Sequence, residues 1–160
     1  MPLAIIRANP KDDAALSALA RAAKAHWDYP DHWLEQWREE LTVTSAFIAR
    51  NETFKAIING HVIGFHALLE SGATWRLEHL WVHPESMGEG VGRALFWHAV
   101  ARARARGASR LTIESDPHAE AFYRHMGAQR VGLVASKIDG QLRERPLLEF
   151  DLTRPSTPAR

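Results

Sequence analysis

The stretch Glu78-His-Leu-Trp-Val-His-Pro-Glu-Ser-Met-Gly-Glu-Gly-Val-Gly-Arg-Ala-Leu-Phe96 decides the fold of this 160-residue chain. Its first five residues form a short apolar run, which predicts a strand that ends before Pro84. Three glycines then recur at every second position: Gly88, Gly90 and Gly92. Residues 93–106 have helical composition and are followed by Gly107, a residue typical of helix ends. We therefore expect a strand, a tight glycine-rich turn and a helix in succession.

A glycine turn that leads into a helix brings free backbone N–H groups and the positive end of the helix dipole to one place. Such a place binds anions, and phosphate is the usual one. Glycines are needed there because a side chain would obstruct the phosphate or the positive φ angle of the turn. The stretch has no Lys-Ser/Thr pair for a P-loop, and its glycine spacing does not match the dinucleotide fingerprint GxGxxG.

Length and composition predict one globular domain, residues 1–153, followed by a disordered tail, residues 154–160. Hydrophobic residues make up 46% of the chain, enough for a core, and charged residues an ordinary 24%. The net charge of +1 gives no overall field to attract nucleic acid or an anionic membrane. No apolar run is long enough to span a bilayer and the first residues do not resemble a signal peptide, so we expect a cytoplasmic protein.

Cysteine is absent, which excludes disulfides, thiolate ligands and a cysteine nucleophile. The nine histidines show no HExxH pattern and no ligand spacing with a carboxylate, so we expect no metal. Several arginines crowd the segment of residues 93–110. Positive charges near the C-terminal end of a helix interact favourably with the helix dipole, which explains these arginines without a ligand. A nucleic-acid binding module is the alternative, and the net charge of +1 argues against it.

Residue patterns predict strands at residues 3–7, 54–58, 62–69, 75–82, 111–114, 130–135 and 147–152. They predict helices at residues 13–23, 33–41, 93–106 and 117–126. Asn59-Gly60 is the strongest hairpin signal, since both positions of a type I′ turn have positive φ. Residues 42–53 have no clear pattern.

The turn Met87-Gly88-Glu89-Gly90-Val91-Gly92 resembles the acyl-CoA motif of the GNAT superfamily of N-acetyltransferases, [Arg/Gln]-x-x-Gly-x-[Gly/Ala]. The strand that precedes this motif in the family, Leu-x-Val, corresponds to Leu80-Trp81-Val82. Met87 departs from the Arg or Gln of the first motif position. In the family, backbone amides of this turn hold most of the pyrophosphate, so the departure bears on affinity more than on the assignment.

A second stretch, residues 115–128, resembles the family motif Asn-x-x-Ala-x-x-Phe-Tyr-x-x-x-Gly-Phe. Ala119, Phe122-Tyr123 and Gly127 match it, whereas Asp116 replaces the usual Asn and Ala128 the usual Phe. The two motifs occur in the family's order, and the whole stretch also resembles a group of bacterial GNAT proteins.

The resemblance implies an α/β fold with a mixed, mostly antiparallel sheet of about seven strands flanked by about four helices. It implies an N-acetyltransferase that uses acetyl-CoA as co-substrate and acts on a primary amine of a small or amino-acid-like acceptor by direct attack in a ternary complex. A homodimer through the C-terminal strands is a further hypothesis. The residues expected to bind acetyl-CoA are Leu80, Trp81, Val82, Met87, Gly88, Glu89, Gly90, Val91, Gly92, Arg93, Asp116, Ala119, Phe122 and Tyr123.

Tyr123 is expected to protonate the departing thiolate, since a phenol with a pKa near 10 can share a proton with a thiol. Its alternative is a packing role in the helix. Glu78 is the expected base, and His66, His83, His118, Glu114 and solvent are alternatives. Trp27 and Tyr29 are expected to bind a cationic acceptor, or else to lie in an interface or a packed corner. A CoA-binding sensor of the same fold is the alternative to an enzyme.

Overall fold

The computed structural model describes residues 2–154. Its sheet has seven strands in the order β1-β2-β3-β4-β5-β7-β6. The strands are β1 Ala4–Arg7, β2 Glu52–Ile58, β3 His61–Leu69, β4 Thr74–Val82, β5 Arg110–Glu114, β6 Gln129–Ile138 and β7 Gln141–Asp151. The α-helices are α1 Asp13–Ala25, α2 Asp31–Gln36, α3 Ser45–Arg50, α4 Val91–Ala105 and α5 Glu120–Met126. Short 3₁₀ turns are η1 Pro10–Asp12, η2 Pro84–Ser86 and η3 Pro117–Ala119.

The described chain divides into two compact units, and β3, β4 and α4 each run through both. Unit 1 contains residues 2–67 and His79–His98, and unit 2 contains Leu68–Glu78 and residues 99–154.

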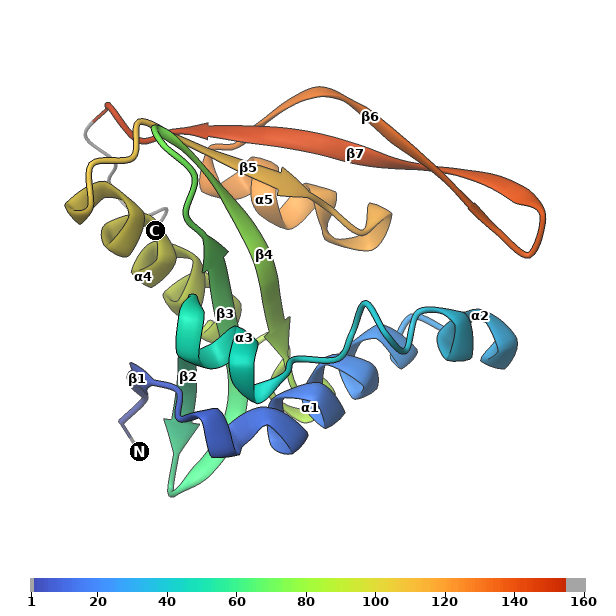
Figure 1. The fold of residues 1–160 in the computed structure, drawn as a ribbon, viewed down its shortest axis with the longest axis horizontal. Coiled ribbons are helices and arrows are strands. Elements are labelled where there is room, and N and C mark those ends of the chain that lie inside the picture. The colour runs from blue at the N-terminus through green and yellow to red at the C-terminus, as the bar shows by residue number, and fades with distance from the viewer. Residues whose placement is uncertain (1, 155–160) are drawn as a thin grey trace. The chain divides into compact units, whose positions relative to one another are not determined.

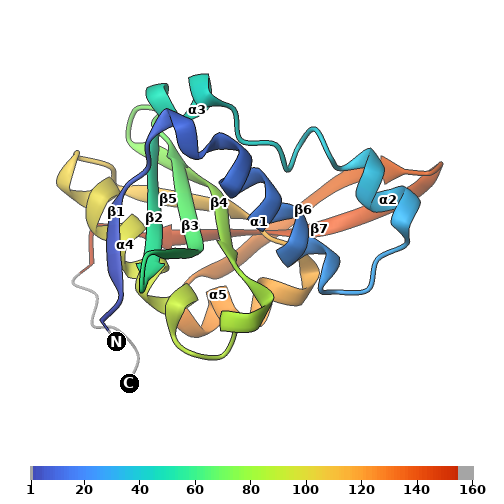
Figure 2. The same cartoon turned by 90° about the horizontal axis from the view of Figure 1, so that it is seen from below.

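In unit 1, β1 pairs antiparallel with β2, and β3 follows β2 in the sheet (Figure 2). The hairpin between β2 and β3 turns at Asn59-Gly60, whose φ angles of 53° and 78° confirm the predicted turn. The first turns of α4 pack on one face of these strands, where Val91 and Leu95 form a buried cluster with Ala56. The turn before α4 is thereby fixed to the sheet through the helix that follows it.

In unit 2, β4 runs parallel to β5, whereas β5 and β6 run antiparallel to β7. Figure 1 shows β6 and β7 as a long twisted hairpin. Its turn lies at Asp139 and Gly140, with φ angles of 54° and 74°. The sheet is therefore mixed and mostly antiparallel, as the sequence predicts.

Several predicted elements were wrong in their bounds, and four of them differ most clearly. The second helix ends at Gln36 rather than Leu41, because Glu39 and Glu40 would place two carboxylates at the negative end of a longer helix. Helix α4 begins at Val91, two residues before the predicted start. The last two strands extend further toward the turn between them than predicted: β6 ends at Ile138 rather than Ala135, and β7 begins at Gln141 rather than Leu147.

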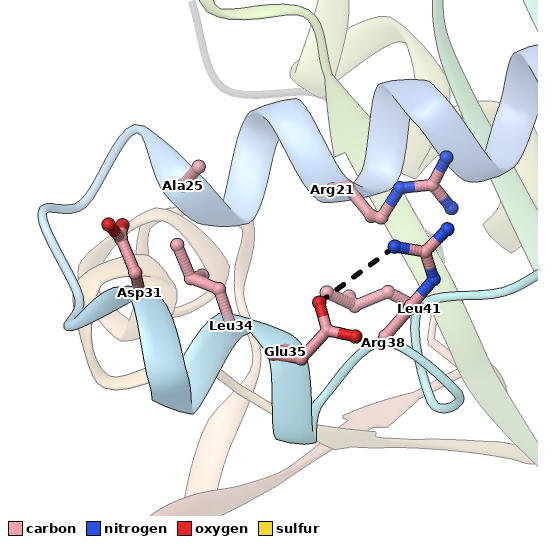
Figure 3. A pocket seen from close by; sticks show the side chains of 7 residues that line it. All are labelled: Arg21, Ala25, Asp31, Leu34, Glu35, Arg38 and Leu41. Carbon is pink, nitrogen blue, oxygen red and sulfur yellow. Dashed lines mark ion pairs between the residues drawn. The ribbon is translucent and has the colours of Figure 1, made fainter.

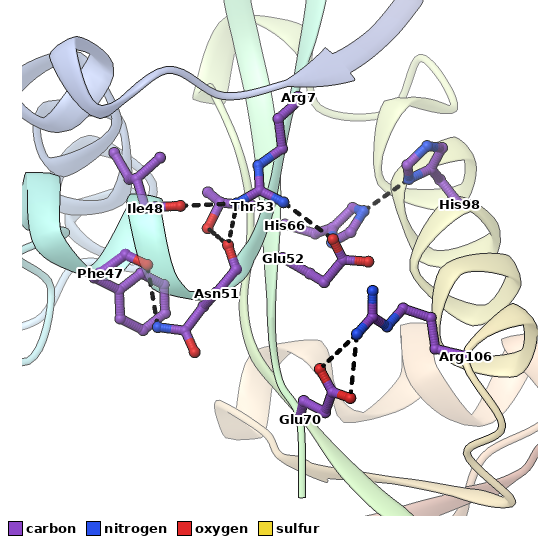
Figure 4. Close-up of polar contacts among 10 residues, drawn as sticks. All are labelled: Arg7, Phe47, Ile48, Asn51, Glu52, Thr53, His66, Glu70, His98 and Arg106. Atoms are coloured by element: carbon purple, nitrogen blue, oxygen red, sulfur yellow. Dashed lines mark hydrogen bonds and ion pairs between the residues drawn. The ribbon is translucent and has the colours of Figure 1, made fainter.

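The unpatterned residues 42–53 contain a helix, α3, which the sequence analysis missed. The hydroxyl oxygen of Thr44 accepts a hydrogen bond from the Phe47 N–H at 3.0 Å and so caps its first turn. Arg7 donates to the carbonyl oxygens of Ile48 and Asn51, both at 2.9 Å, and fixes the end of α3 beside β1 (Figure 4). Of the predicted tail, residues 155–160 lie outside the described residues.

Candidate active site

The glycine-rich turn of unit 1 has the backbone geometry that the sequence predicts. Gly88 and Gly90 have φ angles of 82° and 86°, in the left-handed region that favours glycine. A Cβ atom at either position would meet no atom within 4 Å, so the backbone here is open on its outer side. Gly92 is already the second residue of α4. The first amides of a 15-residue helix thus directly follow two glycines that leave room for a bound anion.

Arg93 stands in the first turn of α4, and its guanidinium has no ion pair or hydrogen bond with any other residue that the structure describes. Other arginines in the segment of residues 93–110 already have partners. Arg104 donates to the carbonyl oxygens of Leu152 and Arg154, and Arg106 pairs with Glu70 at 3.2 Å. Arg93 is therefore the arginine of this segment that can meet a phosphate without first breaking a contact.

The end of β4 turns its side chains to two different environments. Leu80 and Val82 pack on the cluster of Val91 and Leu95. His79 is buried between the rings of Phe47 and Phe65, with centroid distances of 5.8 and 5.7 Å.

Trp81 lies beside His79 and donates its indole N–H to the Nδ1 atom of that histidine at 3.0 Å. This hydrogen bond orients the Trp81 side chain. The chain then passes through η2 to the glycine turn, so the strand and the turn of the proposed acyl-CoA motif both lie in unit 1.

The predicted acceptor residue Tyr29 belongs to an aromatic cluster. Its ring lies 6.3 Å from that of Trp33 and 4.9 Å from that of Trp37. The ammonium of Lys24 lies over the faces of Tyr29 and Trp37. Trp27 is 36% exposed, and its ring lies edge-on to that of His26 at a centroid distance of 4.9 Å. The cation-binding face expected of Tyr29 thus already carries a cation of the same chain.

A pocket of about 190 Å³ opens between α1 and α2, also in unit 1 (Figure 3). Arg21 and Arg38 extend into it side by side, and Leu34 and Leu41 provide apolar walls. Arg38 pairs with Glu35 at 3.8 Å. No predicted site residue lines this pocket.

In unit 2, Tyr123 lies in α5 and is only 6% exposed. Burial, with a smaller contribution from the negative charge of Asp116, raises the pKa of its phenol well above the usual value near 10. Phe122 contacts the Tyr123 ring edge-on at 5.2 Å. The phenol is therefore neutral and a hydrogen-bond donor throughout the neutral pH range.

Asp116, which replaces the usual Asn of the motif, caps η3. Its Oδ1 atom accepts from the backbone N–H of His118 and lies 2.8 Å from the Nδ1 atom of the same residue. Its Oδ2 atom lies 3.6 Å from Nη2 of Arg143, a residue of β7. Both side chains of this ion pair are nearly buried, at 9% and 13% exposure. The exchange of Asn for Asp is thus accompanied by a counter-ion.

Glu78, the expected base, lies on β4 in unit 2 with a side chain 27% exposed. Its carboxylate is 3.4 Å from Nη2 of Arg76. The same guanidinium nitrogen is 2.9 Å from Glu114, which also contacts Arg145. Glu78 and Glu114, two separate candidates for the base in the sequence, are therefore linked through one arginine.

Two of the histidines considered as bases have structural contacts instead. His66 is fully buried, and its Nε2 atom lies 2.9 Å from Nδ1 of His98 (Figure 4). His83 accepts the Glu85 N–H at 3.2 Å and caps η2. Since these two histidines are engaged, Glu78, whose carboxylate is partly exposed, stays the candidate base on β4.

Among residues 2–154, no group of three or more His, Asp or Glu side chains is arranged to hold a metal ion. Within the same residues, none of the helices has the length and apolar character that crossing a bilayer requires.

The arginine partners of the carboxylates were missed by the sequence analysis. Arg76, Arg143 and Arg145 come from β4 and β7, and their partners lie far away in the sequence. Two signals could have drawn attention to them: Arg143 and Arg145 alternate along β7, and Arg76 shares a face of β4 with Glu78.

Residues 14–128 match the family model described as Acetyltransferase (GNAT) family. A streptothricin acetyltransferase of Streptomyces lavendulae is 37% identical over 102 residues, which are 60% of this chain and 54% of that protein. The chain thus spans about half the length of this curated relative.

Two solved structures show the same fold. A protein of Rhodopseudomonas palustris, described as a GCN5-related N-acetyltransferase and class-II aminotransferase, has a TM-score of 0.78 at 24% identity and covers 94% of this chain and 96% of its own. The PaiA N-acetyltransferase of Thermoplasma acidophilum, in complex with coenzyme A, has a TM-score of 0.72 at 18% identity, with 94% and 99% covered.

Proposed function

Because the chain belongs to the acetyltransferase (GNAT) family, we propose that it transfers an acetyl group from acetyl-CoA to a primary amine of a small or amino-acid-like acceptor. The observation that carries the proposal is the turn at Gly88 and Gly90, where two left-handed glycines directly precede the amides of α4 within the family-matched segment. Backbone N–H groups in this arrangement suit a pyrophosphate.

The residues of this chain fit the groups of acetyl-CoA in two further respects. Arg93, in the first turn of α4, can meet a phosphate. The parallel ladder between β4 and β5 ends at Arg76 and Thr112, although both strands continue, so backbone N–H and C=O groups beyond that point can pair with the amides of the pantetheine arm. A metal has no part in this proposal.

In the proposed reaction, the neutral amine nitrogen attacks the thioester carbonyl carbon in a ternary complex, the new N–C bond forms and the C–S bond breaks. Glu78 takes the amine proton, directly or through water. Tyr123 faces the sulfur. Since a thiol with a pKa of about 8.5 is a stronger acid than this buried phenol, Tyr123 stabilises the departing thiolate chiefly by donating a hydrogen bond.

The proposed acceptor is a primary amine, because the reaction needs a nitrogen nucleophile that can attack the thioester carbonyl. The curated relative is described as a streptothricin acetyltransferase, so streptothricin belongs in the panel of amines to be tested, together with diamines, amino acids and aminoacyl amides. Trp27, and Tyr29 if Lys24 yields its place, are the aromatic residues proposed to contact a cationic acceptor.

Two measurements test the proposal. Acetyl-CoA at millimolar concentration should raise the melting temperature, since a ligand that binds only the folded chain stabilises it. An assay for released thiol should then detect turnover with at least one amine of the panel. Tyr123→Phe should lower kcat by about 10- to 100-fold with little change in KM. Stabilisation by acetyl-CoA without any product would indicate a CoA-binding sensor, and absence of both effects would exclude the proposal.

A further inference from the structure

The parallel ladder between β4 and β5 is only three residues long. It joins Thr74 to Arg110 and Arg76 to Thr112, whereas β4 continues to Val82 and β5 to Glu114. If the register were continued by two residues, Glu78 would stand opposite Glu114. Two carboxylates in that position repel each other, and a third group is needed to hold them near one another.

Arg76 provides that group. Its Nη2 atom lies 3.4 Å from Oε1 of Glu78 and 2.9 Å from Oε2 of Glu114. The other oxygen of Glu114, Oε1, lies 3.3 Å from Nη2 of Arg145 on β7. Three strands of unit 2 are therefore connected by a chain of four side chains, in the order Glu78, Arg76, Glu114 and Arg145, in which the charges alternate.

The guanidinium of Arg76 is held through these carboxylates. Its Nε atom is buried and has no hydrogen-bond partner among residues 2–154, so its remaining N–H groups must orient the side chain. Glu114 and Arg145 are 21% and 26% exposed at their side chains, which limits the screening of their charges by solvent. Arg76 is thus held by Glu114, which Arg145 in turn contacts, and its Nη2 atom lies between the carboxylates of Glu114 and Glu78.

We propose that Arg76 is a positioning residue for Glu78, and that Glu114 and Arg145 hold Arg76 in the orientation that this requires. The inference rests on the proposed function, in which Glu78 takes the amine proton. A carboxylate near the end of a backbone ladder has several rotamers available, and a misplaced base loses much of its effect. Arg76 restricts Glu78 to one rotamer. It does this beyond the last paired residues of β4 and β5, where backbone pairing no longer holds the two strands together.

A double-mutant cycle separates this role from a general effect on stability. Arg76→Met should lower kcat by about tenfold and leave KM for acetyl-CoA within about twofold, and Arg76→Lys should recover part of the loss. In a Glu78→Gln background, Arg76→Met should have less than about a twofold further effect, because there is no base left to position. Glu114→Gln should lower kcat in the same direction as Arg76→Met but by less.

Arg110→Met is the matched control. Arg110 pairs with Glu149 across β5 and β7 at 3.6 Å, and its loss should leave kcat unchanged. An equal loss of kcat from Arg76→Met in the wild-type and Glu78→Gln backgrounds would overturn the inference, since a structural role predicts that result.

The crystal structure of Arg76→Met decides the inference independently of activity. We expect the Glu78 carboxylate to leave its present position, and an unchanged Glu78 side chain would overturn the inference. Absence of turnover in the wild-type protein, with Glu78 displaced in the variant, would contradict the proposed function and leave the link between Arg76 and Glu78 standing.

Discussion

The ammonium nitrogen of Lys24 lies 4.4 Å from the centroid of the Trp37 ring and 5.0 Å from that of Tyr29. Lys24 is only 8% exposed, and its ammonium faces both of these rings at the corner between α1 and α2. Desolvated contacts of this kind are among the stronger cation–π interactions. An acceptor cation that binds Tyr29 on this face would therefore have to displace Lys24.

Lys24→Met should destabilise the fold, because it keeps most of the apolar stem and removes the charge. We expect a loss of about 1–2 kcal/mol in the free energy of unfolding, measured by urea denaturation. Lys11→Met, at an exposed position in η1, is the control and should change it by less than about 0.5 kcal/mol. Equal effects of the two substitutions would contradict the assignment.

The buried phenol of Tyr123 should make stability depend on alkaline pH. Below about pH 10 the phenol is neutral in the folded and the unfolded chain, and its contribution is fully present. Above that pH the unfolded phenol ionises while the folded one keeps its proton, since its folded-state pKa is raised. The free energy of unfolding should then fall by up to about 1.4 kcal/mol per pH unit.

Comparison with Tyr123→Phe isolates this effect. The difference in unfolding free energy between wild type and variant should be constant from pH 7 to 9 and should shrink from pH 10 to 11. Asp116→Asn restores the usual family residue and removes a negative charge that raises the folded-state pKa of the phenol. Stability should therefore begin to fall near pH 10 in both proteins, and the fall should continue to a higher pH in the wild type than in this variant. A difference that does not vary with pH would show that Tyr123 is solvated.

Gly64 on β3 is a close-packing position. A Cβ atom there would lie 2.9 Å from Leu95 Cδ1 and 2.9 Å from the Trp81 carbonyl oxygen. Gly64→Ala should therefore destabilise the protein by about 1–3 kcal/mol, since the carbonyl belongs to the backbone and cannot move aside freely. Thermal unfolding of both variants checks this prediction. Gly132→Ala, whose Cβ atom would meet nothing within 4 Å, is the control and should have little effect.

Gly90→Ala should act on the co-substrate rather than on the fold. The strain of a left-handed alanine costs about 1 kcal/mol, and the new methyl group stands on the open side of the turn. We expect KM for acetyl-CoA to rise at least fivefold. Gly72→Ala has the same kind of positive φ angle in a different turn, so it should cost similar stability and leave this KM unchanged. If both variants bind acetyl-CoA alike, the turn does not hold the pyrophosphate.

The sequence predicts those parts of the fold that have a local signal. Asn59-Gly60 specifies its hairpin, and the glycine turn and α4 follow from spacing within twenty residues. Helix α3 was missed because six residues show too little periodicity, although Thr44 carries the cap signal. Asp139-Gly140 is also a typical hairpin turn sequence. A turn predicted there would have given both flanking strands the lengths that the structure shows.

The sequence predicts the candidate site residues that lie in or next to a family motif, but not the charged residues that contact them. Glu78 and Tyr123 can be selected from their strand and helix. Strand alternation also places Arg76 on the same face as Glu78, but the contact of Arg76 with Glu114 spans 38 positions and leaves no periodic trace. Lys24 lies only a few residues from Tyr29, yet its orientation depends on Trp37, which comes from the turn after α2. Long-range charge pairing of this kind is decided by tertiary packing.

The place of β5 in the sheet has a consequence for the chain during its synthesis. Residues 110–114 pair with β4 on one edge and with β7 on the other, and β7 is the last strand to leave the ribosome. Until residues 141–151 have emerged, the nascent chain carries β5 as an unprotected strand edge, which is prone to join other chains. A chaperone that binds nascent chains should therefore improve the yield of this protein most when translation is slowed between residues 115 and 140.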